Sequence, residues 1–269
     1  MNEKLEKFES LLENLKIKLS VEEFSNFMIE NDLTEEQMDS IIQTFDFIRQ
    51  KKEESSVAFL YKCSRLPQKI RKTFDNFNFE DVHGKDCERL KSLRTLSPIY
   101  ARKNLVFIGP PGTGKTHLAM AFGTECCQKM LKTYFLNMAE LNEMFTLARQ
   151  GGKVARLMST LVKPTCLIID EVGHCVFDRE NTRLFFDMVN RRYNKDCNSN
   201  MVFTSNYQPF AWRECFTETN SLLCALDRIF DNSLTFNFSG ESHRGQNNEV
   251  LSFTTKRARS IEPLPQQGN

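Results

Sequence analysis

The stretch from Asn104 to Leu118, NLVFIGPPGTGKTHL, constrains the fold of this chain more than any other. An apolar run, Leu105 to Ile108, leads directly into GPPGTGKT, which matches the phosphate-binding pattern G-x-x-x-x-G-K-[ST] in full. Such a run without alternation is typical of a parallel strand buried on both faces, and the residues after Thr116 favour a helix. The alternative is a Gly/Pro turn that matches the pattern by chance, and the strand before it and the helix after it disfavour that alternative. The pattern therefore predicts a nucleotide-binding α/β domain.

The residue types in this loop suit a nucleoside triphosphate with its magnesium ion. Glycines let backbone N–H groups turn toward phosphate oxygens, and the helix N-terminus adds partial positive charge. Lys115 is expected to reach the β- and γ-phosphates, and the Thr116 hydroxyl to bind Mg²⁺. The predicted nucleotide-binding residues of the loop are Gly109, Pro110, Pro111, Gly112, Thr113, Gly114, Lys115 and Thr116.

A second motif, LIIDE, ends in two carboxylates 55 residues after Lys115. Its apolar part predicts another buried strand, and ligands of open α/β sheets bind at the carboxyl ends of the strands. Asp170 is expected to hold Mg²⁺ through water, and Glu171 to act as the general base that activates the attacking water. A later strand ends in Thr204-Ser205-Asn206, where a polar residue can align that water; a simple turn is the alternative.

Apolar strands alternate with helical stretches from Asn104 onward, which predicts a parallel sheet covered by helices on both faces. The five predicted strands are 105–108, 133–138, 165–170, 201–206 and 234–238. We divide the chain into a helical N-terminal module (1–54), a basic linker (55–80), the ATPase domain (81–245) and a polar tail expected to be poorly ordered (246–269).

The N-terminal module is predicted from apolar residues at three- and four-residue spacing and from two helix-capping pairs, Ser20 with Glu23 and Thr34 with Gln37. It could be a packing domain, a docking module or a DNA-binding head. In the linker, a run of cations is either a solvated face or a surface for a phosphate backbone. Phe74, Phe77 and Phe79 are expected to anchor the linker to the main domain.

Charge is distributed unevenly, although the net charge is only +1. Residues 1–54 hold 14 acidic and 7 basic residues, so this part carries −7 and the remainder +8. The positive charge therefore lies on the part predicted to bind nucleotide, as expected of a protein that contacts polyanions.

The remaining composition points to a cytoplasmic protein. The nine cysteines form no C-x-x-C pair, and neither they nor the four histidines have the spacing of a zinc site, so we expect reduced thiols. The first residues, MNEKLEKFES, carry charges where a signal peptide needs an apolar core. No run of about 18 apolar residues predicts a membrane span.

Several motifs occur together and in a fixed order: GPPGTGKTHLA, LIIDEVG, FDRENTRLFFDMVNRRY, TSN followed by PFAW, ALDRIF and GESHR. In this order they resemble one family of AAA+ P-loop ATPases, the insertion-sequence helper ATPases (IstB-like), which are related to helicase loaders of the DnaC and DnaI type. The resemblance is dense over residues 70–245. The chain differs at His174-Cys175-Val176, where family members commonly carry Tyr-Leu-Pro, and at His243, where they tend to have Tyr.

The resemblance implies roles for three further residues. Asn206 resembles the residue called sensor 1, and Arg244 the residue called sensor 2. Arg228 resembles an arginine finger, which reaches the γ-phosphate bound by a neighbouring subunit, so a homo-oligomer is implied. In these relatives a helical insertion after the second strand faces DNA. The cations of that region are Arg149, Lys153, Arg156 and Lys163.

Three functions are compatible with these features. The resemblance favours an ATP- and Mg²⁺-dependent helper that assembles on DNA and assists a transposase. A helicase loader, whose partner is a replicative helicase, is the alternative. A small-molecule P-loop kinase is weakest, because Glu171, Asn206 and Arg228 suit attack by water.

Overall fold

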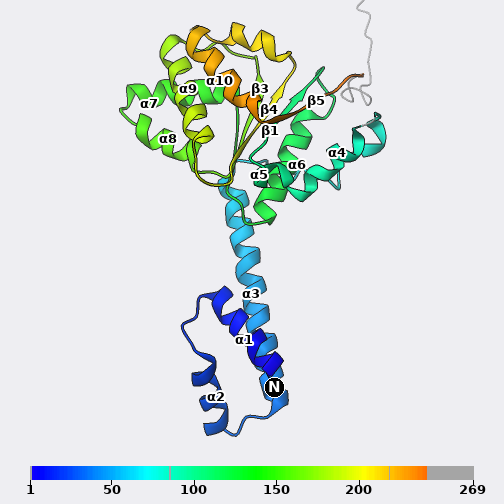
Figure 1. Cartoon of the computed structure of the whole chain (residues 1–269), viewed down its shortest axis with the longest axis vertical. Coiled ribbons are helices and arrows are strands. Elements are labelled where there is room, and N and C mark those ends of the chain that lie inside the picture. Colours follow the sequence, from blue (N-terminus) through cyan, green and yellow to red (C-terminus); the bar gives the residue numbers. More distant parts are fainter. Residues whose placement is uncertain (1, 85, 218, 241–269) are drawn as a thin grey trace, which may run out of the picture.

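A computed structural model describes residues 2–84, 86–217 and 219–240 of the chain, apart from the side chains of residue 2 and residues 219–223. The molecule has an α/β domain and a helical N-terminal module joined to it by one long helix, α3 (Figure 1). In the described part, no helix is both long enough and apolar enough to span a lipid bilayer.

Five parallel strands form the sheet in the order β2-β3-β4-β1-β5. The strands are β1 (Asn104–Ile108), β2 (Thr133–Asn137), β3 (Cys166–Val172), β4 (Asn200–Ser205) and β5 (Ser233–Asn237). The predicted five-stranded parallel sheet is thereby confirmed. All strands run the same way, so their carboxyl ends, including the end of β1 at the phosphate loop, meet at one edge.

Helices cover both faces of the sheet. The helices of this domain are α4 (Cys87–Lys91), α5 (Ser97–Tyr100), α6 (Lys115–Gln128), α7 (Met138–Gln150), α8 (Val154–Val162), α9 (Arg179–Tyr193) and α10 (Thr219–Asp231). Short 3-10 turns are η1 (Phe79–Asp81), η2 (Ser92–Thr95) and η3 (Pro209–Cys215).

Alternate residues of the strands enter two separate cores. Val106 and Ile108 pack with residues of α7, α8, α9 and α10 on one face. Leu105 and Phe107 pack with residues of α6 and of the short helices α4 and α5 on the other. Both faces of β1 are fully buried, which explains its unbroken apolar sequence.

The N-terminal module consists of α1 (Asn2–Leu15), α2 (Val21–Glu30) and α3 (Glu35–Cys63) around a small aromatic and aliphatic core. Both predicted capping boxes are present. The Ser20 backbone N–H donates to the Glu23 carboxylate (2.8 Å), and the Thr34 N–H to the Gln37 amide oxygen (2.7 Å). These caps fix the starts of α2 and α3 through local contacts.

The predicted boundary at residue 54 falls within α3, which continues to Cys63 and packs against α6 and β2. A 29-residue helix can cross the boundary because Thr34 caps its start and its polar middle needs no core. Leu66 and Phe74 are buried in the core on the α6 face, and Phe77 and Phe79 pack against it. The predicted aromatic anchor is confirmed, whereas the division into domains stays a prediction.

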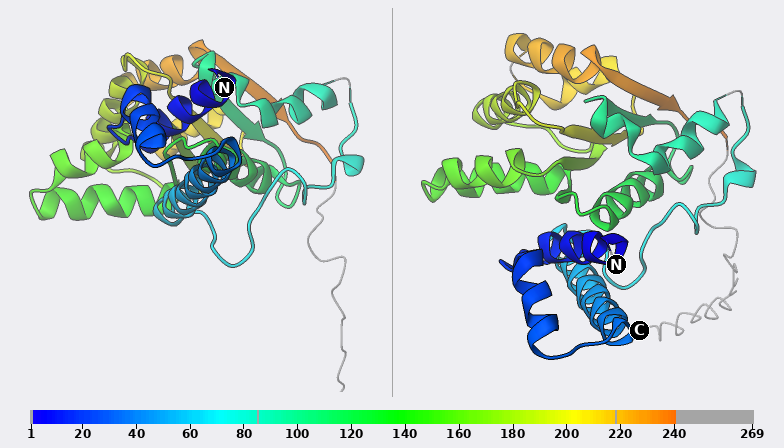
Figure 2. Two further views of the ribbon diagram at one scale, coloured as in Figure 1. Left: turned by 90° about the horizontal axis from the view of Figure 1, so that it is seen from below. Right: turned by 60° about the horizontal axis from the view of Figure 1, so that its bottom comes forward.

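The linker cations have mixed surroundings. Arg65 pairs with Glu140 at 3.2 Å, and the Arg71 guanidinium lies over the Tyr61 ring, 4.4 Å from its centroid. From the end of α3 the linker passes α6 on its way to α4 (Figure 2).

Candidate nucleotide-binding site

The phosphate loop connects the end of β1 to the start of α6, as the sequence predicts. Gly109, Gly112 and Gly114 all have positive φ (149°, 80° and 89°). A Cβ at Gly109 would collide with the Phe238 carbonyl oxygen, and one at Gly114 would lie 2.7 Å from the Phe77 ring. At these two positions glycine permits both the backbone conformation and the close approach of a neighbour.

Lys115 is buried at the first position of α6 and is aimed back over the loop. Its Nζ donates to the carbonyl oxygens of Gly109 (2.8 Å) and Pro110 (2.6 Å). The ammonium group is therefore already held over the concave side of the loop, where phosphate oxygens would approach the backbone N–H groups.

Asp170 and Thr116 meet at the carboxyl edge of the sheet. The Thr116 hydroxyl donates to Asp170 Oδ1 at 2.9 Å, and the Thr204 hydroxyl donates to the same oxygen. Burial raises the pKa of Asp170 above its ordinary value, and the bonds from Thr204 and Thr116 oppose that rise. A hydroxyl and a carboxylate oxygen are the donors that Mg²⁺ prefers, so this pair fits the ion beside a triphosphate.

Thr204 is a further residue of this candidate site, and the sequence analysis named it only as part of the strand end Thr204-Ser205-Asn206. Besides donating to Asp170, its hydroxyl accepts the backbone N–H of Glu171 at 3.0 Å. The available signal was a hydroxyl residue near the end of a strand. Its significance depends on β4 lying beside β3, which the pattern of strands alone does not decide.

Glu171 follows Asp170 in the left-handed backbone region, with φ of 58°. The β3–β4 register shifts between Ile169 and Val172, so the sheet is irregular at this position. Strained non-glycine residues of this kind cost roughly 1–3 kcal/mol and cluster at functional sites. The carboxylate of Glu171 is exposed, in contrast to that of Asp170.

One cavity of about 480 Å³ brings the predicted phosphate-end residues together. It is lined by the loop, by Glu171 and Asn206, and by Pro67 and Lys72 of the linker. The amide of Asn206 donates to His174 Nε2 at 3.1 Å. The structure thus unites Lys115, Thr116, Glu171 and Asn206 around one space, with Asp170 hydrogen-bonded to Thr116.

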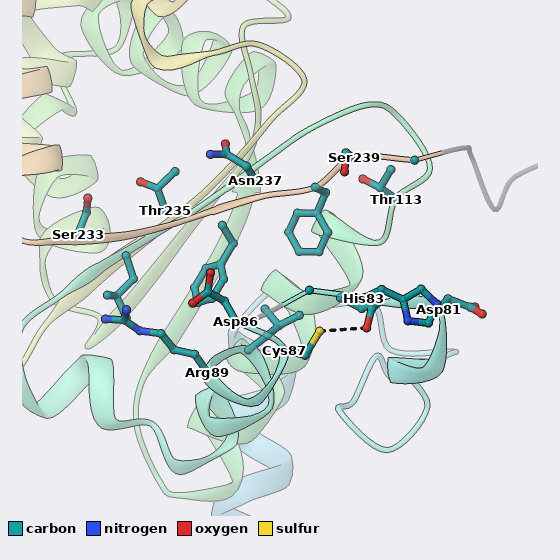
Figure 3. A pocket seen from close by; sticks show the side chains of 17 residues that line it. Asp81, His83, Asp86, Cys87, Arg89, Thr113, Ser233, Thr235, Asn237 and Ser239 are labelled. Atoms are coloured by element: carbon teal, nitrogen blue, oxygen red, sulfur yellow. Dashed lines mark hydrogen bonds between the residues drawn. The ribbon is translucent and has the colours of Figure 1, made fainter.

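A second cavity of about 810 Å³ lies on the other side of the loop, between α4 and β5, and includes Thr113 (Figure 3). Val82, Leu90 and Phe238 give it apolar walls, while Asp81 and His83 add polar groups at one end. Its volume falls within the roughly 300–1,000 Å³ of small-molecule sites, which is ample for a nucleoside.

Arg228 lies away from this site. Its guanidinium is over the Phe186 ring (5.3 Å) and near the Tyr193 ring (6.0 Å), and it donates to the Cys224 carbonyl. It lines a third cavity together with Asn104 and Asn200, where β1 and β4 begin. Arg228 is therefore at the opposite end of the sheet from the chain's own phosphate loop. Arg244 lies outside the described residues.

The predicted DNA contacts lie on α7 and α8, which project from one side of the domain, away from α4 and β5 (Figures 1 and 2). Arg149 forms a two-pronged ion pair with Asp178 (2.8 and 3.2 Å), so its charge is partly neutralised within the chain. Lys153, Arg156 and Lys163 flank or belong to α8 and are exposed.

The parallel sheet, the phosphate loop at the end of β1 and the hydrogen bond from Thr116 to Asp170 at the end of β3 define a P-loop nucleotide-binding protein with the AAA+ fold. Residues 10–250 match the family model described as IstB-like ATP binding protein, and the chain belongs to this family.

Two relatives are named after insertion sequences. The chain is 38% identical to "Insertion sequence IS5376 putative ATP-binding protein" of Geobacillus stearothermophilus, over 72% of this chain and 75% of the relative. It is 32% identical to "Insertion sequence IS21 putative ATP-binding protein" of Pseudomonas aeruginosa, over 74% of each.

Solved structures share the fold at low identity. DnaI matches 67% of this chain and 95% of its own, with a TM-score of 0.51 and 20% identity. AMPPCP-bound DnaA from Aquifex aeolicus matches 65% of this chain and 51% of its own, with a TM-score of 0.52 and 16% identity.

Proposed function

We propose that this protein is a Mg²⁺-dependent ATPase that assembles on DNA and assists a transposase. The observation that carries the ATPase part is the single cavity shared by Lys115, Thr116, Glu171 and Asn206, with Asp170 hydrogen-bonded to Thr116. The chain's membership of a family of ATP-binding proteins supports ATP as the nucleotide.

ATP lies with its β- and γ-phosphates on the loop and its nucleoside in the cavity between α4 and β5. Lys115 leaves the loop carbonyls for the phosphate oxygens, where its charge offsets theirs. Thr116 and, through water, Asp170 would hold a magnesium ion, which would neutralise further phosphate charge when bound. Glu171 accepts a proton from the attacking water, and Asn206 orients that water or the γ-phosphate.

Hydrolysis is completed by a neighbouring copy. Arg228 of one subunit reaches the γ-phosphate of the next. Arg244, which resembles sensor 2, supplies a second cation. The support for this arrangement is that Arg228 lies at the end of the sheet remote from the phosphate loop of its own subunit, so the nucleotide it acts on is the one bound by a neighbour.

The transposition role rests on relatives named after insertion sequences. A helicase loader remains the alternative, and it rests on the shared fold with DnaI alone. Binding assays with a transposase encoded beside this protein, and with the replicative helicase of the same host, separate the two. Tight binding of the helicase alone contradicts the transposition role.

Glu171→Gln tests the ATPase mechanism. The variant keeps shape and nucleotide affinity but loses the base, so turnover falls by roughly 10²–10⁴. Glu54→Gln, an exposed carboxylate on α3, is the matched control and leaves turnover unchanged. Nucleotide affinity and phosphate release are measured on the same preparations. Normal turnover by Glu171→Gln excludes it as the base.

DNA binding is tested by replacing Lys153, Arg156 and Lys163 with Gln. The unaltered protein is expected to lose DNA affinity steeply as salt rises, because cations on the DNA-facing surface displace counterions. The triple variant should bind more weakly and with a shallower salt slope. A slope equal to that of the unaltered protein contradicts a DNA-binding role for α8.

A further inference from the structure

The turn after β3 contains Gly173 and His174, and it packs tightly against Tyr207. Gly173 has φ of 112°, and a Cβ there would collide with the Tyr207 ring. The His174 backbone N–H donates to the Glu171 carbonyl at 3.3 Å and closes the turn. The imidazole of His174 is 5.9 Å from the Tyr207 ring, centroid to centroid. Position 174 is thus tied to both Glu171 and the end of β4.

The backbone on both sides of Asn206 is also held, with Ser205 as the hub. The Ser205 hydroxyl donates to the Val172 carbonyl at 2.6 Å. It accepts the Tyr207 backbone N–H at 3.0 Å and the Trp212 indole N–H at 3.1 Å. These bonds do not hold the Asn206 side chain. Its amide can still flip, which exchanges the positions of the oxygen and the nitrogen.

His174 restricts that freedom by binding one end of the amide. Asn206 Nδ2 lies 3.1 Å from His174 Nε2 and, as an amide N–H, donates to it, so Nε2 is the acceptor in this arrangement. With Nδ2 directed at the imidazole, the amide oxygen and the second N–H face other directions in one defined orientation. Asn206 lines the same cavity as Lys115 and Glu171, so this orientation determines what it offers to the γ-phosphate and the attacking water.

We propose that His174 is a positioning residue for ATP hydrolysis, which sets the orientation of the Asn206 amide through the hydrogen bond between His174 Nε2 and Asn206 Nδ2. This inference rests on the proposed ATPase function. His174 holds the amide in place before the nucleotide arrives, so no ordering is needed during the reaction. The effect falls on turnover and not on nucleotide affinity, because the loop and Lys115 bind the phosphates independently of position 174.

The test compares His174→Phe with His174→Gln in the full chain, with ATP as substrate and DNA present. Phe keeps a ring against Tyr207 but cannot accept a hydrogen bond, so kcat falls roughly tenfold to hundredfold. KM and nucleotide affinity change by less than about twofold, as expected for loss of an interaction that acts on the chemical step. Gln offers an amide oxygen to Asn206 and restores most of kcat. Cys175→Ala, at the adjacent position, is the control and changes neither parameter.

A double-mutant cycle provides the second measurement. In an Asn206→Ala background, His174→Phe causes no further loss, because both substitutions act through one amide. Multiplicative losses overturn the proposal. So does an equal loss with Phe and Gln accompanied by a lower unfolding temperature, which identifies a structural role.

These measurements distinguish failure of the proposed role of His174 from failure of the proposed ATPase function. If the unaltered protein hydrolyses ATP and His174→Phe has normal kcat, the role of His174 is overturned and the ATPase function stands. If the unaltered protein fails to hydrolyse ATP with DNA and its partner present, the proposed function fails, and the role of His174 with it.

Discussion

The two ends of the parallel sheet hold their charged groups in different ways. At the carboxyl end, Lys115 and Asp170 are both buried and both hydrogen-bonded within the candidate nucleotide site. At the opposite end, two arginines have contrasting surroundings. Arg192 is 3% exposed and donates to five backbone carbonyls, whereas Arg228 is half-buried and has one carbonyl of its own helix and two aromatic rings.

Arg192 and Arg228 show that residue type alone does not distinguish a structural arginine from a candidate ligand-binding one. Burial lowers the pKa of Arg192 to about 10, so it remains charged at neutral pH and donates hydrogen bonds to a cluster of carbonyl oxygens. These bonds join α9 to the end of α8, to the segment before β3 and to the first residue of β4. Arg228 has fewer hydrogen bonds, which is why it, and not Arg192, is the arginine proposed to act on a neighbouring subunit.

Arg228→Ala is expected to have the largest effect on turnover. Removal of an arginine that stabilises transferring phosphate costs about 10³–10⁵ in rate, while nucleotide binding on the intact loop persists. Mixing Arg228→Ala with Lys115→Ala should restore part of the activity, because interfaces then form that combine an intact loop with an intact arginine. Phosphate release is measured across mixing ratios. Absence of recovery at every ratio argues against action between subunits.

Arg192→Met should affect stability and leave the chemistry of the folded protein alone. It removes the donor from several buried carbonyl oxygens, and each one left without a partner costs about 1–3 kcal/mol in the free energy of unfolding. Arg191→Met is the matched control, because Arg191 is an exposed partner of Asp187 on the same helix and contributes at most about 1 kcal/mol. Denaturant unfolding checks both variants. Equal stability of the two would remove the distinction between a structural and an available arginine.

Thr204→Val tests the hydrogen bonds at the phosphate end of the sheet and has the smallest expected effect. Valine fills the same space but cannot donate to Asp170 or accept from Glu171, so the free energy of unfolding falls by about 1–3 kcal/mol. Turnover should fall as well, since both carboxylate residues lose a fixed neighbour. Ser205→Ala breaks a different set of bonds on the same strand and serves for comparison. Unchanged stability and turnover in Thr204→Val would show that the carboxyl edge is held without this hydroxyl.

Local signals carried much of the prediction. The phosphate loop, its flanking strand and helix, and both capping boxes depend on residues within a few positions of one another, and all appear as expected. The three phenylalanines of the linker were predicted to anchor it because a close apolar cluster needs a core. The predicted domain boundary at residue 54 had no such signal, and α3 runs through it.

The site is less predictable where it depends on contacts between distant segments. Thr204 meets Asp170 across 34 positions of sequence, and Asn206 meets His174 across 32. A pattern of apolar and polar residues marks where each strand ends but not which strands are neighbours, so neither contact follows from it.

The chain's own residue order determined the phosphate loop, the alternation of strands and helices and the starts of α2 and α3, because hydrogen bonding and burial in these elements are satisfied locally. Which strand ends lie next to one another depends on the tertiary structure. That choice made Thr204 the support of Asp170, gave His174 its contact with Asn206, and separated the structural Arg192 from Arg228. The physical reason is that the sheet order, set by packing of two cores on opposite faces, brings together side chains that no local interaction connects.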